Sequence, residues 1–261
     1  MRDCKVWLGF ILALIVLVFG NAGQVAFAAS PDPLIAGKQP RGSFGYDISF
    51  PQCPAALPTQ PFSFAVVGVT EGIAFSTNDC LHDEFLWAQQ SLHAAPGLYL
   101  NIHSVMWSTA LQSMDGPKGK CLWSNYSCQS YNYGYNTAQA AFNYAKDQGA
   151  TTQMWWLDVE WMNYWTYNTA LNDLVIQGAV DFVVAQGAAV GIYSTQLQWN
   201  YIAGPRFVPT LPRNASMPLW LATVARNTEA ASYCSADNGF GGGTIWYVQY
   251  PGRTFDENYM C

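Results

Sequence analysis

The sequence predicts an α/β fold built around a mainly parallel sheet. Short apolar segments alternate with helical segments, a pattern typical of repeated strand–helix units. Residues 42–261 contain no internal repeat, low-complexity tract or second linker, which fits one domain of the size of an α/β barrel. A proline-bearing stretch without periodicity, residues 29–41, precedes this domain and is expected to be a linker. After Pro205 helix signals become sparse, so the regular alternation should break there.

Seven short apolar runs are expected to form strands, and two helices are well marked between them. The first helix is capped by Asn136 or Thr137 and stops before Gly149. The second carries apolar residues over 171–183 at the i, i+3, i+4, i+7 spacing and ends at Gly187. A helix between two apolar strands makes a βαβ unit, hence parallel strands. The expected strands cover residues 45–50, 64–70, 97–103, 154–160, 189–194, 219–222 and 244–250.

The first residues have the features of an export signal. Arg2 and Lys5 precede an apolar run over 6–19, and Ala26-Phe27-Ala28 has the small-x-small pattern of a cleavage site. The apolar run is short for a membrane span, which needs about 20 residues. We therefore expect residues 1–28 to be a signal peptide cleaved near Ala28 and the protein to be secreted, without stable membrane insertion. An uncleaved N-terminal anchor is the alternative.

Composition and charge narrow the classes of partner. Charged residues make up 11% of the chain, well below the usual ~25%, whereas aromatic residues make up 15%. Loss of Arg2, Asp3 and Lys5 with the signal peptide reduces 11 basic and 17 acidic residues to 9 and 16, a net charge of −7. Nucleic acids and anionic membranes require a basic footprint, so neither is expected as a partner. An uncharged, aromatic-rich surface suits sugars, whose C–H faces lie on aromatic rings.

The cysteines indicate disulfide bonds rather than metal or thiol chemistry. Six remain after removal of the signal peptide, and an even number in an exported chain reads as a disulfide framework. Their spacing forms no paired CxxC zinc pattern, and the histidines His82, His93 and His103 show no HExxH pattern. No cofactor or metal is expected. A serine hydrolase is disfavoured because GxSxG is missing, and full pairing leaves no thiol for a cysteine peptidase.

Two acids end one of the expected strands. In Trp155-Trp156-Leu157-Asp158-Val159-Glu160, side chains alternate between faces, so Asp158 and Glu160 point the same way. Such a pair can cleave a glycosidic bond, which needs one neutral and one charged carboxyl. Sites in parallel α/β folds lie at the carboxyl ends of strands, where this pair sits. The alternative is a strand end where both acids meet solvent or pair with an arginine.

Six segments, in the same order along the chain, resemble the motifs of glycoside hydrolase family 25 lysozymes, which are N-acetylmuramidases. The matches extend from Gly45 to Asn258. Departures at Phe50-Pro51-Gln52-Cys53 and in the cysteine-framed loop 121–135 indicate a divergent exported bacterial branch. The matching segments are Gly45-Tyr46-Asp47-Ile48-Ser49, Val66 to Gly72, Leu157-Asp158-Val159-Glu160, Gly191-Ile192-Tyr193-Ser194, Pro218-Leu219-Trp220-Leu221-Ala222, and Trp246 to Tyr250 followed by Phe255-Asp256-Glu257-Asn258.

The resemblance implies a modified TIM-type barrel of about five βα units followed by helix-poor antiparallel strands. It implies cleavage of the β-1,4 bonds of peptidoglycan by a monomer, with Glu160 as general acid. Asp158 would hold the substrate's N-acetyl group or stabilise developing positive charge, while Asp47 and Asp256 would shape the site and raise the pKa of Glu160 by proximity. A catalytically inactive glycan-binding barrel is the main alternative, and a hydrolase of another polysaccharide is a further one.

Substrate contacts and disulfide partners complete the expectations. Tyr193, Trp220 and Gln249 lie within the matching motifs and are expected to bind substrate, and Trp161 and Trp123 are expected to stack on sugar rings. Among the other aromatic candidates, Tyr126, Tyr131, Tyr133, Tyr135 and Trp165, ordinary packing is an equal alternative for Tyr133 and Tyr135. Because loops after the first two strands share one barrel face, we predict a Cys53–Cys80 pair. We also predict Cys121–Cys128 and Cys234–Cys261 pairs.

Overall fold

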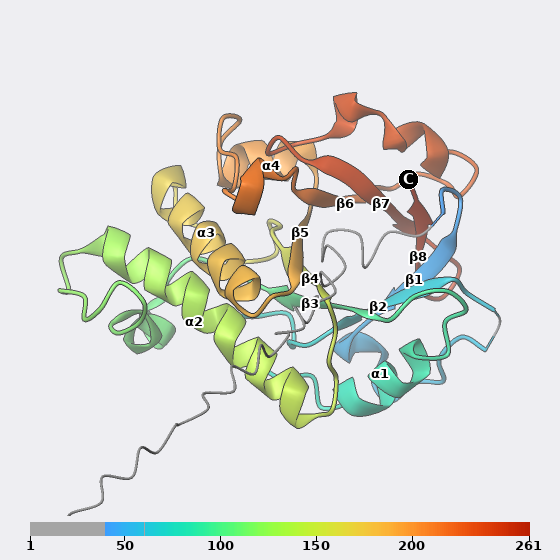
Figure 1. Ribbon diagram of the computed structural model, residues 1–261, viewed down its shortest axis with the longest axis horizontal. Helices are drawn as coiled ribbons and strands as arrows, with labels where there is room; N and C mark the ends of the chain where they lie inside the picture. The colour runs from blue at the N-terminus through green and yellow to red at the C-terminus, as the bar shows by residue number, and fades with distance from the viewer. Residues whose placement is uncertain (1–39, 60) are drawn as a thin grey trace, which may run out of the picture. The chain divides into compact units, whose positions relative to one another are not determined.

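The computed structural model describes residues 40–59 and 61–261, and the predicted signal peptide and nearly all of the predicted linker lie outside them (Figure 1). Eight strands close into a barrel in chain order. Residues at alternate positions along each strand point inside. The strands are β1 (Phe44–Ile48), β2 (Phe64–Gly68), β3 (Gly97–Asn101), β4 (Met154–Asp158), β5 (Ala189–Ser194), β6 (Pro218–Ala222), β7 (Thr244–Pro251) and β8 (Asp256–Met260).

The barrel is parallel except at its last strand. Strands β1 to β7 pair in parallel, and β8 pairs antiparallel with both β7 and β1. The seven predicted strands are confirmed, as is the modified α/β barrel. The expected antiparallel pairing is confined to β8, because β6 and β7 continue the parallel order. The sequence did not predict β8, whose residues Asp-Glu-Asn-Tyr-Met do not form an apolar run.

Four helices cover the barrel: α1 (Leu81–Ala88), α2 (Tyr126–Asp147), α3 (Thr169–Ala185) and α4 (Gln196–Ile202) (Figure 1). Each follows one of the strands β2 to β5. Among the described residues, the helical elements after α4 are all short 3-10 turns, which agrees with the predicted loss of helix signals. The first strand is followed by such a turn as well, at Phe50–Gln52.

Helix α2 starts earlier than the sequence predicted. Its N-terminal cap is Asn125, whose side chain accepts a hydrogen bond from the backbone N–H of Cys128 at 3.1 Å. The predicted cap at Asn136 or Thr137 was therefore wrong, and most of the segment expected to be a loop is helical. The first part of α2 is rich in polar residues, so it shows no periodic apolar pattern that would predict a helix. Packing against α3 supplies its stability instead, as tertiary contacts commonly do.

Helices α2 and α3 approach each other closely at two glycines. A Cβ atom on Gly134 would lie 1.8 Å from the carbonyl oxygen of Val175, and one on Gly178 would lie 2.2 Å from that of Tyr131. Only glycine allows this contact. The helix pair therefore forms a fixed wall behind β3, β4 and β5, whose carboxyl ends carry part of the site described below (Figure 1).

Aromatic side chains fill the inside of the barrel. Trp156 lies against Trp220 and Tyr247, with ring centroids 5.7 and 4.9 Å apart. A Cβ atom at Gly191 would lie 2.3 Å from the Trp156 ring, so the neighbouring strand needs glycine to admit the indole. A second, larger core lies between the barrel and its helices. The filled interior is a packed core rather than a pore, which leaves the carboxyl ends of the strands as the place for a site.

All three predicted disulfide bonds are confirmed. Cys53 pairs with Cys80, Cys121 with Cys128, and Cys234 with Cys261, with Cα–Cα distances of 5.8, 5.7 and 5.5 Å. The first joins the loops after β1 and β2, as expected from their common face. The third fastens the last residue to the loop after β6. Within the described part of the chain, no helix has the length and apolarity needed to cross a membrane.

Candidate active site

A cavity of about 190 Å³ opens at the carboxyl ends of the barrel strands and gathers all four acids predicted from the sequence. Asp47 comes from β1, Asp158 is the last residue of β4, and Glu160 follows two residues later. Because β8 is antiparallel, its first residue, Asp256, lies opposite Asp47. The predicted common orientation of Asp158 and Glu160 therefore holds. The remaining lining residues are Ser49, Pro51, Gln52, Tyr99, Tyr193, Trp220 and Gln249.

Asp158 is buried, with 4% of its surface exposed, and accepts hydrogen bonds from two amides. Asn101 donates to Oδ2 at 2.5 Å, and Asn163 donates to Oδ1 at 3.4 Å and to the backbone carbonyl at 3.2 Å. Burial raises the pKa of Asp158 well above its ordinary value, and the nearby Glu160 raises it further, whereas the bond from Asn163 lowers it. These amide donors favour the charged form of Asp158.

The orientation of the Asn101 amide is fixed by Thr70. The Thr70 hydroxyl accepts a hydrogen bond from the Asn101 backbone N–H at 2.9 Å and donates to Asn101 Oδ1 at 2.7 Å. With its oxygen engaged, the amide can present only its NH₂ group to Asp158. Both Thr70 and Asn101 are buried. These hydrogen bonds run from Thr70, just after β2, through Asn101 of β3 to Asp158 of β4, and they hold the Asp158 carboxylate in one position.

Glu160 is half-buried, just beyond the end of β4. Burial raises the pKa of its carboxyl group. Its backbone carbonyl accepts hydrogen bonds from the Asn163 N–H at 3.1 Å and from the Trp165 indole at 3.0 Å, which fix the turn that carries the side chain. Compared with Asp158, Glu160 is the more accessible acid of the pair.

Asp47 is held by a second set of amides. Gln249 donates to its Oδ1 at 3.0 Å, and Asn258 donates to its Oδ2 at 2.7 Å. Burial and the negative charge of Asp256 raise the pKa of Asp47 to about 7, although both amide bonds lower it. Burial also raises the pKa of Asp256. The amides are themselves oriented, because Tyr193 donates to Gln249 Oε1 at 2.8 Å and Trp220 donates to Asn258 Oδ1 at 2.7 Å.

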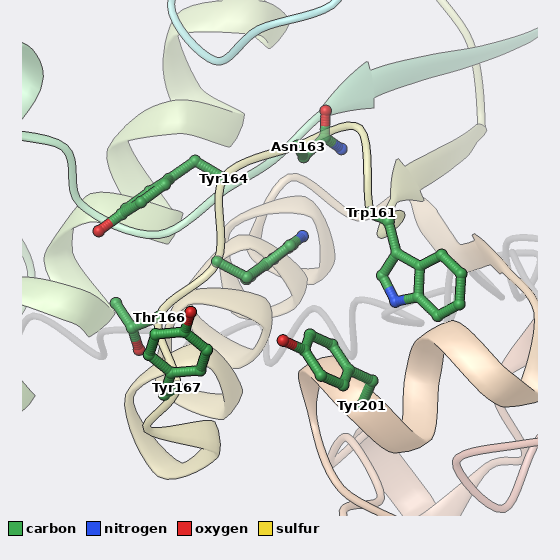
Figure 2. Close-up of a pocket in the computed structure, with 7 residues that line it drawn as sticks. Trp161, Asn163, Tyr164, Thr166, Tyr167 and Tyr201 are labelled. Carbon is green, nitrogen blue, oxygen red and sulfur yellow. The ribbon is translucent and has the colours of Figure 1, made fainter.

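The residues predicted to bind substrate fall into three places. Tyr193, Trp220 and Gln249 line the acid cavity, but Trp220 is only 2% exposed and forms its floor. Trp161 lines a larger neighbouring pocket of about 640 Å³ (Figure 2). Trp123 lines a third cavity, beside the 3-10 turn at Trp107–Ser113, together with Tyr126. The structure therefore does not bring Trp123 to the acids.

Three tyrosines of α2 that were candidates for sugar stacking pack within the protein. Tyr133 is fully buried and its hydroxyl bonds Thr109 at 2.7 Å. Tyr135 contacts Phe182 of α3 edge to face. Tyr131 donates to Asp181. For Tyr133 and Tyr135, ordinary packing was the alternative interpretation, and it is the one the contacts support.

Sequence reasoning assigned no role to Asn101, Asn163 and Asn258, although each directly contacts an acid of the cavity. Asn101 lies in an expected strand, and Asn258 lies in the final motif that was quoted for its aspartate. Alternation within a strand could have placed Asn258 on the same face as Asp256. Asn163 gives no comparable signal, because it lies in an irregular loop.

Comparisons with known proteins find sequence similarity to lysozyme-like proteins. Residues 122–242 match the family model described as Lysozyme-like protein 1. A Dictyostelium discoideum protein described as a probable GH family 25 lysozyme 2 is 29% identical over 111 residues, which are 41% of this chain and 48% of that protein. The chain thus matches about half the length of this curated relative.

A solved structure shares the fold. The spore cortex lytic enzyme SleM of Clostridium perfringens superposes with a TM-score of 0.51 and 15% identity, covering 86% of this chain and 68% of that one. The catalytic domain of the endolysin ply40, from bacteriophage P40 of Listeria monocytogenes, gives a TM-score of 0.49 and 16% identity, covering 85% and 95%. The family match and the curated relative thus show similarity to lysozyme-like proteins over part of the chain, and the superposition on SleM shows a shared fold.

Proposed function

We propose that the protein is an exported glycoside hydrolase that cleaves the β-1,4 bonds of peptidoglycan, with Glu160 as general acid. The observation that carries the proposal is the convergence of four carboxyl groups on one cavity, two of them held by amide donors. The similarity to lysozyme-like proteins supports the same reaction class. Three disulfide bonds support export, because disulfides persist in oxidising compartments.

Hydrogen bonding supports a division of roles within the acid pair. Both oxygens of Asp158 accept N–H groups, which favours its ionised form. We assign the transferable proton of the pair to Glu160, which is the more accessible acid and whose pKa is raised by burial. Glu160 is also the more accessible of the two, so it can reach the oxygen of the leaving sugar. Asp158 stabilises the positive charge that develops at the anomeric carbon, or holds the neighbouring N-acetyl group.

Asp47 and Asp256 form the opposite side of the cavity. The negative charge of Asp256 raises the pKa of Asp47. Gln249 and Tyr193 complete this side with polar groups that can meet sugar hydroxyls. The cavity thus combines a proton donor, a charged stabiliser and neutral hydrogen-bonding groups.

The proposal is tested by Glu160→Gln, which keeps the shape of the side chain and removes its transferable proton. Loss of general acid catalysis typically reduces the rate by 10²–10⁴-fold. The assay follows the turbidity of purified cell walls and measures the reducing ends that are released. Glu229→Gln is a matched control, since Glu229 is exposed in the loop after β6 and its carboxylate accepts a hydrogen bond from the nearby Arg226 N–H. Retention of near-parental cleavage by Glu160→Gln would overturn the proposal, and binding without release of reducing ends would favour an inactive glycan-binding barrel.

A further inference from the structure

A second pocket lies beside the acid cavity, on the loop that follows Glu160. We define the aromatic pocket by Trp161, Tyr164, Tyr167 and Tyr201, which line a volume of about 640 Å³ together with Asn163, Trp165 and Thr166. Figure 2 shows Trp161 and Tyr201 on one side of it and Tyr164 and Tyr167 on the other. Its volume falls in the range of small-molecule sites, about 300–1,000 Å³.

The rings of the aromatic pocket are strongly exposed to solvent. Tyr167 is 97% exposed, Tyr201 60% and Trp161 52%. Several exposed aromatic residues on one face are not needed for the core and mark a binding surface. None of the lining residues is charged. Flat rings edged by hydroxyl and amide groups match a neutral pyranose, whose C–H faces are apolar and whose rim carries hydroxyls.

Hydrogen bonds hold the backbone beneath these rings. The Trp161 N–H donates to Gln198 of α4 at 2.6 Å, and the Tyr164 carbonyl accepts from the Ser104 N–H at 2.8 Å. Asn172 of α3 is fully buried and donates to the carbonyls of Thr166 at 2.9 Å and of Ile202 at 2.8 Å. The loop after β4 and the end of α4 are therefore fixed to the same helix. A platform ordered in advance loses less entropy when a ligand binds.

Two contacts link the residues of the aromatic pocket to the acids of the cavity. Asn163, which lines the pocket, donates to the Asp158 carboxylate, and Trp161 directly follows Glu160. A sugar strand with one residue at the acids would therefore place neighbouring residues over the rings. A charged stem peptide has no ionic partner among the lining residues.

We propose that the aromatic pocket binds the neutral sugar strand of the glycan and anchors it beside the acids. This inference rests on the proposed function for the identity of the glycan, but it concerns binding and not cleavage. It assigns Tyr167 and Tyr201 as substrate-positioning residues that do not touch the reacting bond. Their loss should weaken binding and raise KM, whereas kcat should stay the same.

The test measures binding in a Glu160→Gln background, where strands are not cut. The probe is purified peptidoglycan strands freed of stem peptides, titrated by calorimetry, with free stem peptides as a second probe. Tyr167→Ala and Tyr201→Ala should each weaken strand binding about tenfold, the loss typical of an aromatic anchor. Leu92→Ala is the control, because it removes an exposed apolar side chain near the amino ends of the strands.

Weakened strand binding with an unchanged control supports the inference. Unchanged strand binding in both tyrosine variants, or binding of stem peptides in place of strands, overturns it. The two proposals can fail separately. A parent protein that releases no reducing ends while Glu160→Gln binds strands through the tyrosines would refute hydrolysis and support the anchor. Cleavage that depends on Glu160 but not on either tyrosine would do the reverse.

Discussion

Asn101→Ala tests whether the amide beside Asp158 acts in catalysis or only in folding. The change removes the 2.5 Å bond to the carboxylate and the acceptor of the Thr70 hydroxyl. A hydrogen bond to a charged group contributes about 1.5–3 kcal/mol, and each 1.36 kcal/mol of barrier is tenfold in rate. We therefore expect a fall in kcat of roughly tenfold to a hundredfold. The free energy of unfolding should fall by about 1–3 kcal/mol, since the buried Asp158 carboxylate loses a hydrogen-bond donor.

The pH–rate profile separates the two roles of Asn101. An amide donor favours the ionised form of Asp158, so its removal raises the pKa of that carboxyl group. The acidic limb of the profile should move to higher pH. Asn78→Ala is the matched control, since Asn78 donates to the buried Glu84 at 2.6 Å outside the acid cavity. It should lose similar stability and leave the limb in place. If Asn101→Ala loses stability but keeps its rate and its acidic limb, the reasoning is refuted.

Two further predictions concern stability. The pKa of Asp47 is raised from 3.8 to about 7, so the folded protein holds this proton more tightly than the unfolded chain, and this group makes stability fall as pH rises through that interval. Asp256→Asn removes one cause of the raised pKa of Asp47, so stability should fall less steeply as pH rises. Thermal melts at several pH values measure this fall, and an equally steep fall in the variant would contradict the prediction. Chain entropy predicts a loss of about 2.5 kcal/mol on removing Cys121–Cys128 and about 3.6 kcal/mol for Cys53–Cys80 or Cys234–Cys261, whose loops are longer. Denaturant titration of double Cys→Ala variants would measure this order, and a larger loss for Cys121–Cys128 would contradict it.

Local signals predict the barrel well where each element buries an apolar face. The seven apolar strands are visible for that reason, and the first two disulfide-bearing loops follow from parallel order. Helix α2 was only half predicted, because its first turns carry Tyr, Ser, Gln and Asn and are stabilised by contact with α3. Strand β8 was missed because it is short and begins with two acids. In both cases the stabilising partner is distant in sequence, so no local pattern reports it.

The residues of the site were likewise predicted only in part. The acids were predicted because two carboxylates at the end of an apolar strand are unusual and can act together in glycosidic bond cleavage. Their amide partners were not, since an asparagine such as Asn163 in a loop has many structural uses. Trp123 was expected in the cleft because it lies in an aromatic-rich segment, but α2 begins within that segment, at Tyr126, and Trp123 lines another cavity. Composition could indicate sugar binding but could not say which rings remain exposed.

The same arrangement of an oriented amide recurs around the cavity and acts on the charge of its carboxyl groups. Each of three amides has its oxygen occupied by a donor: Asn101 by Thr70, Gln249 by Tyr193 and Asn258 by Trp220. An indole N–H can only donate, and an amide whose oxygen is engaged must turn its NH₂ group elsewhere. In all three cases that group faces a carboxylate, Asp158 for the first amide and Asp47 for the other two. Burial alone would favour neutral carboxyl groups throughout the cavity. The oriented amides oppose this at Asp158 and Asp47, although burial still raises the pKa of both carboxyl groups. Glu160 lies two residues beyond Asp158, so the proposed proton donor stands beside a carboxyl group whose charged form two amides favour.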